Sequence, residues 1–113
     1  MELQYSELTG NIRVLKLIGS LDINGVGQIE TKFTGYGAGE NPRVIVDLSG
    51  VTFLSSIGIR LLTINAKSIA SRGGRMVLLS PIPEVRSVLE VTGMSQVIAM
   101  YDSMESAEAV VAA

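Results

Sequence analysis

The chain has 113 residues, a net charge of −2, 47% apolar residues and 18% charged residues, which suits a globular protein and excludes a disordered one. It contains neither cysteine nor histidine, so disulfides, thiolate zinc sites and a Ser-His-Asp mechanism are excluded. The acidic balance and the five aromatic residues (three Tyr, two Phe) argue against direct nucleic-acid binding, which needs a basic surface and stacking groups.

An N-terminal hairpin is the first element that the sequence predicts. Leu3 and Tyr5 alternate with polar neighbours, and residues 9–11 (Thr-Gly-Asn) are typical of a turn. The apolar segment 12–18 follows as the second strand. Asp22, a few residues later, either caps the next helix or faces a ligand.

The next helix is expected to be short or frayed. Apolar residues at positions i, i+3 and i+7 from Val26 lie on one helical face. However, Gly25 and Gly27 each destabilise a helix interior by roughly 1 kcal/mol relative to alanine. The glycine-rich segment 35–42 then predicts a mobile connection. It lacks the Gly-Lys-Ser/Thr sequence of a phosphate-binding loop, and a strand rather than a helix follows it.

A buried strand and a long helix form the middle of the chain. Residues 43–48 carry apolar groups on both faces, as in a central strand, and Val51 and Phe53 are expected to anchor the following loop in the core. Two apolar stripes run along residues 56–72, so this helix should be largely buried or offer an apolar strip to a partner. Gly73 and Gly74 then supply its end.

The last third of the chain predicts two more strands and two more helices. Pro83 suits the first turn of a helix, and Gly93 suits the position just after its end. Asp102 with Glu105 three residues later resembles a capping box at the start of the final helix. The expected ranges are strand 75–80, strand 96–100 and helix 103–113.

This order of elements predicts an α/β fold. We expect one domain over residues 1–113, with a mixed four- to five-stranded sheet, an N-terminal hairpin and about four helices mainly on one face. The later strand–helix–strand units imply parallel neighbours with right-handed crossovers. A monomer or a weak dimer is compatible with the sequence.

The chemistry of the chain centres on residues 53–60, Phe-Leu-Ser-Ser-Ile-Gly-Ile-Arg, where two hydroxyls lead into the long helix. A helix N-terminus has unpaired N–H groups and partial positive charge, so a serine there either simply caps the helix or carries a phosphate. Arg60, four residues after Ser56, either reaches back towards such a phosphate or is solvated.

Over nearly its whole length the chain resembles a STAS domain of the anti-sigma factor antagonist type. The resemblance rests on five motifs: Gly-Ser-Leu-Asp at 19–22, Val-Asp-Leu-Ser-Gly-Val at 46–51, Phe-Leu-Ser-Ser-Ile-Gly at 53–58, Pro-Glu-Val at 83–85 and Thr-Gly-Met at 92–94. In that family the turn before the long helix typically reads Asp-Ser-Ser/Thr-Gly, and a kinase that is also an anti-sigma factor phosphorylates its first hydroxyl residue. The unphosphorylated domain binds this partner and frees the sigma factor.

The resemblance implies that Ser56 is the phosphorylated residue and that Gly58 is the family glycine. Ser55 replaces the usual Asp, Ile57 replaces a Ser or Thr, and Arg60 stands where a small residue is frequent. The missing Asp removes a charge that would repel a phosphate, but its loss could equally abolish recognition by the kinase. The implied partner-binding residues are Asp22, Ser55, Ser56, Ile57, Gly58 and Arg60.

We therefore expect a protein–protein switch that binds an anti-sigma factor with serine-kinase activity and is regulated at Ser56. The alternative is a cytoplasmic STAS accessory subunit of a membrane lipid-transport or other transporter complex. An enzyme is not expected, because no side-chain base or metal cluster is visible, and neither a metal nor a cofactor is implied. The chain has no run of 18 apolar residues and no signal peptide at its start, so we expect a cytoplasmic protein without membrane insertion.

Overall fold

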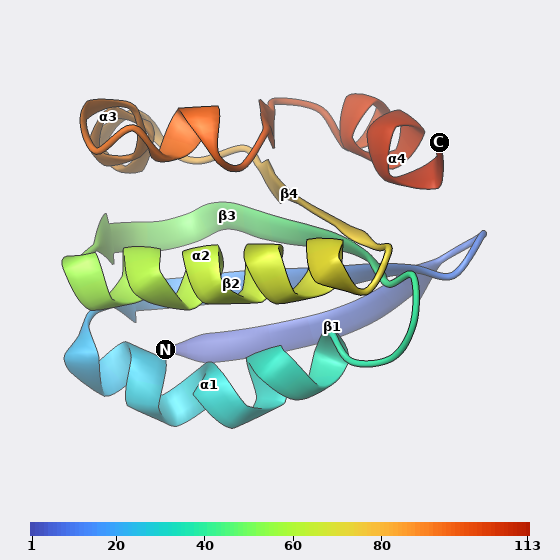
Figure 1. Ribbon diagram of the computed structural model, residues 1–113. Helices are drawn as coiled ribbons and strands as arrows, with labels where there is room; N and C mark the ends of the chain where they lie inside the picture. Colours follow the sequence, from blue (N-terminus) through green and yellow to red (C-terminus); the bar gives the residue numbers. More distant parts are fainter.

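In the computed structural model, which describes residues 1–113, a five-stranded sheet with the order β1-β2-β3-β4-β5 carries four α-helices (Figure 1). The strands are β1 (Glu2–Leu8), β2 (Ile12–Leu21), β3 (Arg43–Leu54), β4 (Arg75–Leu79) and β5 (Met100–Tyr101). The helices are α1 (Ile23–Tyr36), α2 (Ser56–Ser71), α3 (Pro83–Val91), the short 3₁₀ helix η1 (Met94–Gln96) and α4 (Met104–Ala112). The predicted α/β fold is confirmed.

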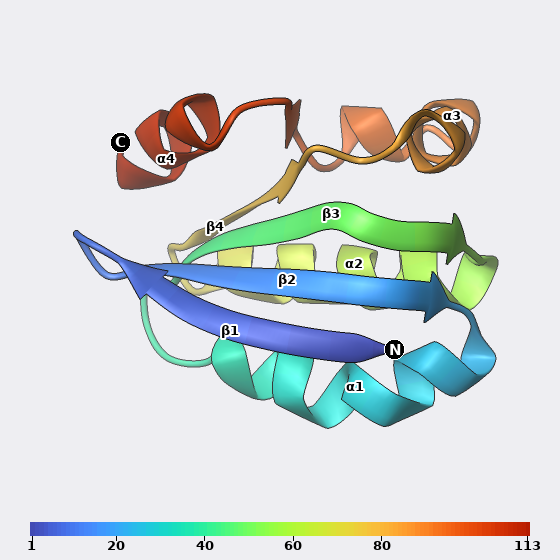
Figure 2. The ribbon, with the colours of Figure 1, turned by 180° about the vertical axis from the view of Figure 1, so that it is seen from behind.

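The sheet is mixed, as expected. β1 and β2 are antiparallel, whereas β2, β3, β4 and β5 run parallel to their neighbours. Gly10 and Asn11 both have positive φ angles, of 86° and 60°, which matches the right-handed twist of a tight hairpin. Because the parallel strands point the same way, β2 and β3 end at one edge of the sheet, and α1 and α2 begin there (Figure 2). This edge is called the carboxyl edge below.

Helices cover the two faces of the sheet unequally. On one face, 20 buried residues form a core to which α1, α2 and α3 contribute, for example through Phe33, Leu62 and Leu89. On the other face, seven buried residues form a smaller core in which Ala107 and Val111 of α4 pack on the sheet. Figure 1 shows α4 apart from the pair formed by α1 and α2. The prediction of helices mainly on one face is thus confirmed.

The central position predicted for residues 43–48 is also confirmed, since β3 lies between β2 and β4 and Val44, Ile45, Val46 and Leu48 are at most 1% exposed. β3 nevertheless continues six residues beyond the expected end, to Leu54. It does so by accommodating irregularities in its pairing with β2, which are typical of β-bulges.

The expectation of a short or frayed first helix is wrong, because α1 runs over 14 residues. Its apolar face is buried through Val26, Ile29 and Phe33, and most helical stability in proteins comes from such packing rather than from propensity. Gly25 is itself buried, and a Cβ there would lie 2.1 Å from the Ser20 carbonyl oxygen. The glycine therefore permits close contact between α1 and the end of β2.

The connection predicted as mobile is partly helical and partly tied down. Its first two residues finish α1, and Arg13 of β2 donates hydrogen bonds to the carbonyl oxygens of Tyr36 and Ala38 at 2.9 and 2.6 Å. Arg72, at the end of α2, donates to the carbonyl oxygen of Gly39 at 2.5 Å. The Tyr36 ring stacks on Tyr5 of β1, with ring centroids 4.0 Å apart. These contacts oppose the mobility that composition alone predicts.

Tyr5 is also the group whose ionisation the fold changes most clearly. Burial raises the pKa of Tyr5 to about 12, and the hydrogen bond that its hydroxyl donates to Glu7 contributes in the same direction. Both effects favour the neutral phenol. Tyr5 thus stays neutral at physiological pH, and its stack with Tyr36 joins the end of α1 to β1.

Two expectations for the C-terminal third require correction. The short strand expected at 96–100 comprises only Met100 and Tyr101, because η1 occupies part of the expected range. The helix cap is Ser103, whose hydroxyl accepts a hydrogen bond from the Ser106 N–H at 3.1 Å, and not Asp102. Asp102 instead forms an ion pair with Arg86 of α3, a partner that local sequence cannot reveal. Pro83 does begin α3, as expected.

Candidate functional site

The turn between β3 and α2 is fixed by the hydroxyl of Ser55. This residue is the N-cap of α2, and its Oγ accepts a hydrogen bond from the Gly58 N–H at 3.3 Å. The same hydroxyl donates to the carbonyl oxygen of Leu21, at the end of β2, at 2.7 Å. The Ser55 N–H donates to that oxygen too, at 3.1 Å. Ser55 thus joins the start of α2 to the neighbouring strand.

We expect Ser55→Ala to lower the free energy of unfolding by about 1–2 kcal/mol, because it removes a helix cap and leaves one acceptor with fewer donors. Ser56→Ala should change the free energy of unfolding by less than about 0.5 kcal/mol, as an exposed substitution. Urea unfolding of the two variants checks the assignment. Equal effects, or a larger effect at Ser56, would show that the cap is assigned to the wrong serine.

Ser56 differs from Ser55 in every respect that matters for chemistry. It is the first residue of α2, it is exposed, and its hydroxyl makes no hydrogen bond within the chain. The sequence left open which serine caps the helix, and the structure assigns that role to Ser55. The hydroxyl of Ser56 therefore lies at the surface without a hydrogen-bond partner in the chain.

Gly58 explains why α2 can begin so close to the sheet. A Cβ at this position would lie 2.6 Å from the Leu21 carbonyl oxygen and 2.9 Å from Cδ1 of Leu54. Backbone atoms cannot retreat from such contacts without moving an element. Gly58 therefore has a packing role beneath Ser56, and it is buried rather than available to a partner.

Asp22 performs for α1 the role that Ser55 performs for α2. Its Oδ1 accepts a hydrogen bond from the Gly25 N–H at 2.8 Å, so the capping alternative is the one observed. Both caps lie at the carboxyl edge, since Leu21, which precedes Asp22, accepts the hydrogen bonds from Ser55. The structure thus brings Asp22, Ser55 and Ser56 to the same edge of the sheet.

Exposed apolar side chains lie at this edge, and one of them contradicts the sequence prediction. Phe53 was expected in the core with Val51, yet it is 54% exposed, while Val51 is fully buried. Gly19 pairs with Val51 and the next residue of β2 pairs with Phe53, so Thr52 is an extra residue in β3. The bulge shifts the in–out alternation by one residue and turns Phe53 outward.

Phe53 is therefore a candidate functional residue that was not predicted from the sequence. Ile23, the first residue of α1, is 70% exposed, and Ile57 next to Ser56 is half-buried. We call Ile23, Phe53 and Ile57 the apolar edge group. All three lie at the carboxyl edge, and a large exposed apolar patch is a feature of surfaces that bind other proteins.

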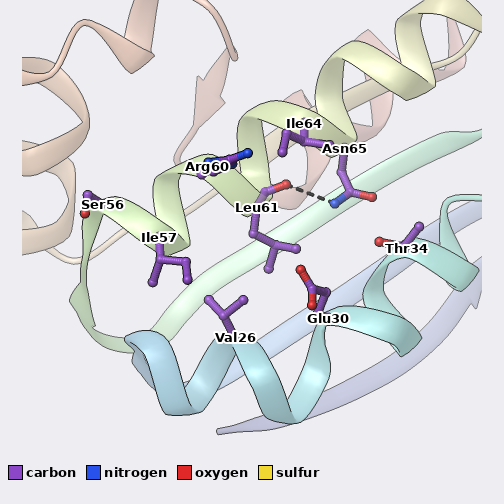
Figure 3. Close-up of a pocket in the computed structure, with 9 residues that line it drawn as sticks. All are labelled: Val26, Glu30, Thr34, Ser56, Ile57, Arg60, Leu61, Ile64 and Asn65. Carbon is purple, nitrogen blue, oxygen red and sulfur yellow. Dashed lines mark hydrogen bonds between the residues drawn. The ribbon is translucent and has the colours of Figure 1, made fainter.

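A groove of about 680 Å³ runs between α1 and α2, starting at Ser56 (Figure 3). Its apolar walls come from both helices, and Asn65, buried at its far end, donates a hydrogen bond to the Leu61 carbonyl oxygen at 2.9 Å. Glu30 of α1 and Arg60 of α2 are its charged residues. The lining consists of Val26, Glu30, Thr34, Ser56, Ile57, Arg60, Leu61, Ile64 and Asn65.

Arg60 lies one helical turn beyond Ser56 and shares this groove with it. Its side chain is exposed and makes neither a hydrogen bond nor an ion pair within the chain.

None of the helices combines the length and apolar character that crossing a membrane would require. The site as a whole offers a free hydroxyl, an unpaired cation and exposed apolar groups at one edge.

Comparison with known proteins shows which family the chain belongs to. The STAS domain model matches residues 6–107. The anti-sigma F factor antagonist of Lysinibacillus sphaericus is 30% identical over 95 residues, covering 83% of this chain and 81% of that protein. The STAS anti-sigma factor antagonist structure from Planctomyces limnophilus is 27% identical, with a TM-score of 0.85 and coverage of 98% of each chain.

The Bacillus cell fate determinant SpoIIAA in its phosphorylated form is 26% identical, with a TM-score of 0.69, covering 96% of this chain and 99% of that one. These similarities extend from the first strand to the last helix, and they include the turn that bears Ser55 and Ser56. The family model and these relatives agree, and the chain belongs to the STAS domain family.

Proposed function

We propose that this protein is an anti-sigma factor antagonist whose partner is an anti-sigma factor with serine-kinase activity, and that phosphorylation of Ser56 switches off their binding. The observation that carries the proposal is the exposed, unbonded hydroxyl of Ser56 at the first residue of α2. A kinase would transfer the γ-phosphoryl group of ATP to this oxygen, with cleavage of the bond to the β-phosphate and release of ADP and the hydroxyl proton, while the neighbouring Ser55 hydroxyl stays engaged in the cap.

The apolar edge group provides the binding surface in this proposal. Phe53 is exposed beside a turn that strong hydrogen bonds hold in place, and a rigid aromatic residue loses little entropy when a partner covers it. Ile57 extends this surface into the groove between α1 and α2. A partner that covers Phe53 and Ile57 would therefore also cover Ser56.

Phosphate on Ser56 should oppose binding much more than it opposes folding. At neutral pH it adds a charge of roughly −1.5 to −2, which a covered interface would have to desolvate. In the free protein the phosphate sits at the start of α2, where the helix dipole stabilises it by about 0.3–1 kcal/mol. Phosphorylation should therefore change the stability of the domain little and lower its affinity for the partner strongly.

The replacement of the family Asp by Ser55 is compatible with this function. Asp and Ser are both preferred N-caps, so Ser55 can keep the backbone of the turn as an aspartate would. The similarity to SpoIIAA, whose structure is known in a phosphorylated form, supports regulation of this chain by phosphorylation. Recognition by the kinase then depends on the apolar edge group and on Ser56 itself, and the following experiment tests this recognition.

We expect Ser56→Asp to weaken the complex with the kinase partner at least about tenfold, because a carboxylate enters the interface. The melting temperature should stay nearly unchanged. Ser56→Ala should still bind and should resist phosphorylation, whereas Ser55→Ala should remain a substrate. The measurements are isothermal titration with the partner recovered from a native pull-down, and mass spectrometry of the 54–60 peptide after kinase treatment.

Phosphate on Ser55 alone would place the modification one residue earlier and contradict the proposal. Absence of phosphate on both serines, with the kinase active on a control substrate, would refute the switch. If the native pull-down instead returned an ABC-type ATPase, the protein would be an accessory subunit of a transport complex. Recovery of a soluble kinase-like ATPase supports the proposed partner class.

A further inference from the structure

Arg60 is the one arginine of the chain whose side chain makes neither a hydrogen bond nor an ion pair. Arg13, Arg43, Arg72 and Arg75 all donate hydrogen bonds to backbone carbonyl oxygens, and Arg86 pairs with Asp102. Arg60 does none of this, although it lies in the middle of the first half of α2. Its role is therefore not explained by the packing of the domain.

The position of Arg60 relative to Ser56 suggests what it does. The two residues are four apart on α2, the spacing at which helical side chains become neighbours. Both line the groove between α1 and α2, and Figure 3 shows them on successive turns with no contact between their side chains. Glu30 on the opposite wall does not form an ion pair with Arg60, so the guanidinium is free to change rotamer.

We propose that Arg60 receives the phosphate of phosphorylated Ser56 in an intrahelical ion pair, and so favours the dianionic form of the phosphate and restrains its position. The inference rests on the proposed phosphorylation of Ser56. Guanidinium groups bind phosphate through charge-assisted, often bidentate hydrogen bonds, and Arg side chains in helices turn preferentially towards the N-terminus. Arg60 is thus a positioning residue with two arrangements: solvent-exposed in the unmodified protein and phosphate-bound in the modified one.

Two carboxylates act on the phosphate in the opposite direction to Arg60. Asp22 caps α1 at the same edge of the sheet, and Glu30 faces the groove from α1. Both raise the pKa of a nearby phosphate, whereas Arg60 lowers it. Neutralising Arg60 removes the one basic side chain that lines the groove with Ser56. The pKa of the phosphoserine therefore reports directly on the proposed pair.

The test uses the full chain with phosphoserine incorporated genetically at position 56, so that no kinase is needed. Phosphorus NMR then follows the second ionisation of the phosphate as pH changes. We expect Arg60→Gln to raise this pKa by roughly 0.3, since an exposed i to i+4 ion pair shifts the ionisation equilibrium about twofold. Lys67→Gln is the matched control, because it removes the same charge from α2 at an exposed site outside the groove.

Arg60→Lys should restore part of the shift, because the ammonium keeps the charge but lacks the planar fork. The Arg60 Nε–H resonance should also move when Ser56 carries phosphate. Equal pKa values in the Arg60→Gln and Lys67→Gln proteins would overturn the inference, because the effect would then be one of net charge. That result would leave the proposed switch intact, whereas failure of the kinase to modify Ser56 would refute the switch without changing this measurement.

Discussion

Gly25→Ala is expected to destabilise the protein by at least about 2 kcal/mol, because an added methyl group would overpack a fully formed contact. The Cβ would lie 2.1 Å from the Ser20 carbonyl oxygen and 3.2 Å from its carbonyl carbon. These are backbone atoms at the end of β2, so relief requires α1 to move away from the strand. Such a movement would also disturb the Asp22 cap, which accepts from the Gly25 N–H.

Gly27→Ala is the matched control, two residues further along the same helix. A Cβ there meets nothing within 4 Å, and alanine reduces the entropy of the unfolded chain, so we expect stabilisation by about 0.5–1 kcal/mol. Urea unfolding followed by circular dichroism gives both values. A pair of stabilising substitutions would mean that α1 does not approach β2 as closely as the structure has it.

Phe53→Ala should produce the largest loss of partner binding among the residues around Ser56. Its side chain is 54% exposed beside the turn that bears Ser56, and buried aromatic anchors in interfaces commonly contribute about 2 kcal/mol or more, which corresponds to roughly 30-fold in affinity. The free energy of unfolding should change little, because the chain buries only part of the ring. Isothermal titration of the unphosphorylated variant with the proposed kinase partner measures the effect.

Val91→Ala provides the comparison for this prediction. Val91 is 84% exposed at the last residue of α3 and does not line the groove at Ser56. Its truncation removes exposed apolar surface and should leave the affinity within about twofold, as expected for a residue outside the interface. An unchanged affinity of the Phe53→Ala protein would remove the apolar edge group from the proposed interface.

The sequence by itself determined the order of the elements and the class of the fold. The turn at Gly10–Asn11, the two-sided apolar segment 43–48 and the start of α3 at Pro83 depend on local conformational preferences and periodicity. The start of the long helix at the two serines could also be predicted, because a capping residue binds N–H groups only a few residues further along the chain. The family resemblance rested on these same local motifs.

Only the tertiary structure decided how the site is assembled. Ser55 became the cap joined to β2 because Leu21, 34 residues earlier in the chain, presents its carbonyl oxygen to it, and Ser56 was thereby left free. Phe53 turned outward because a bulge against β2 shifted the alternation of β3 by one residue. α1 reached its full length because its apolar face was buried on the sheet. Each outcome depends on partners distant in the sequence, and local patterns carry no information about them.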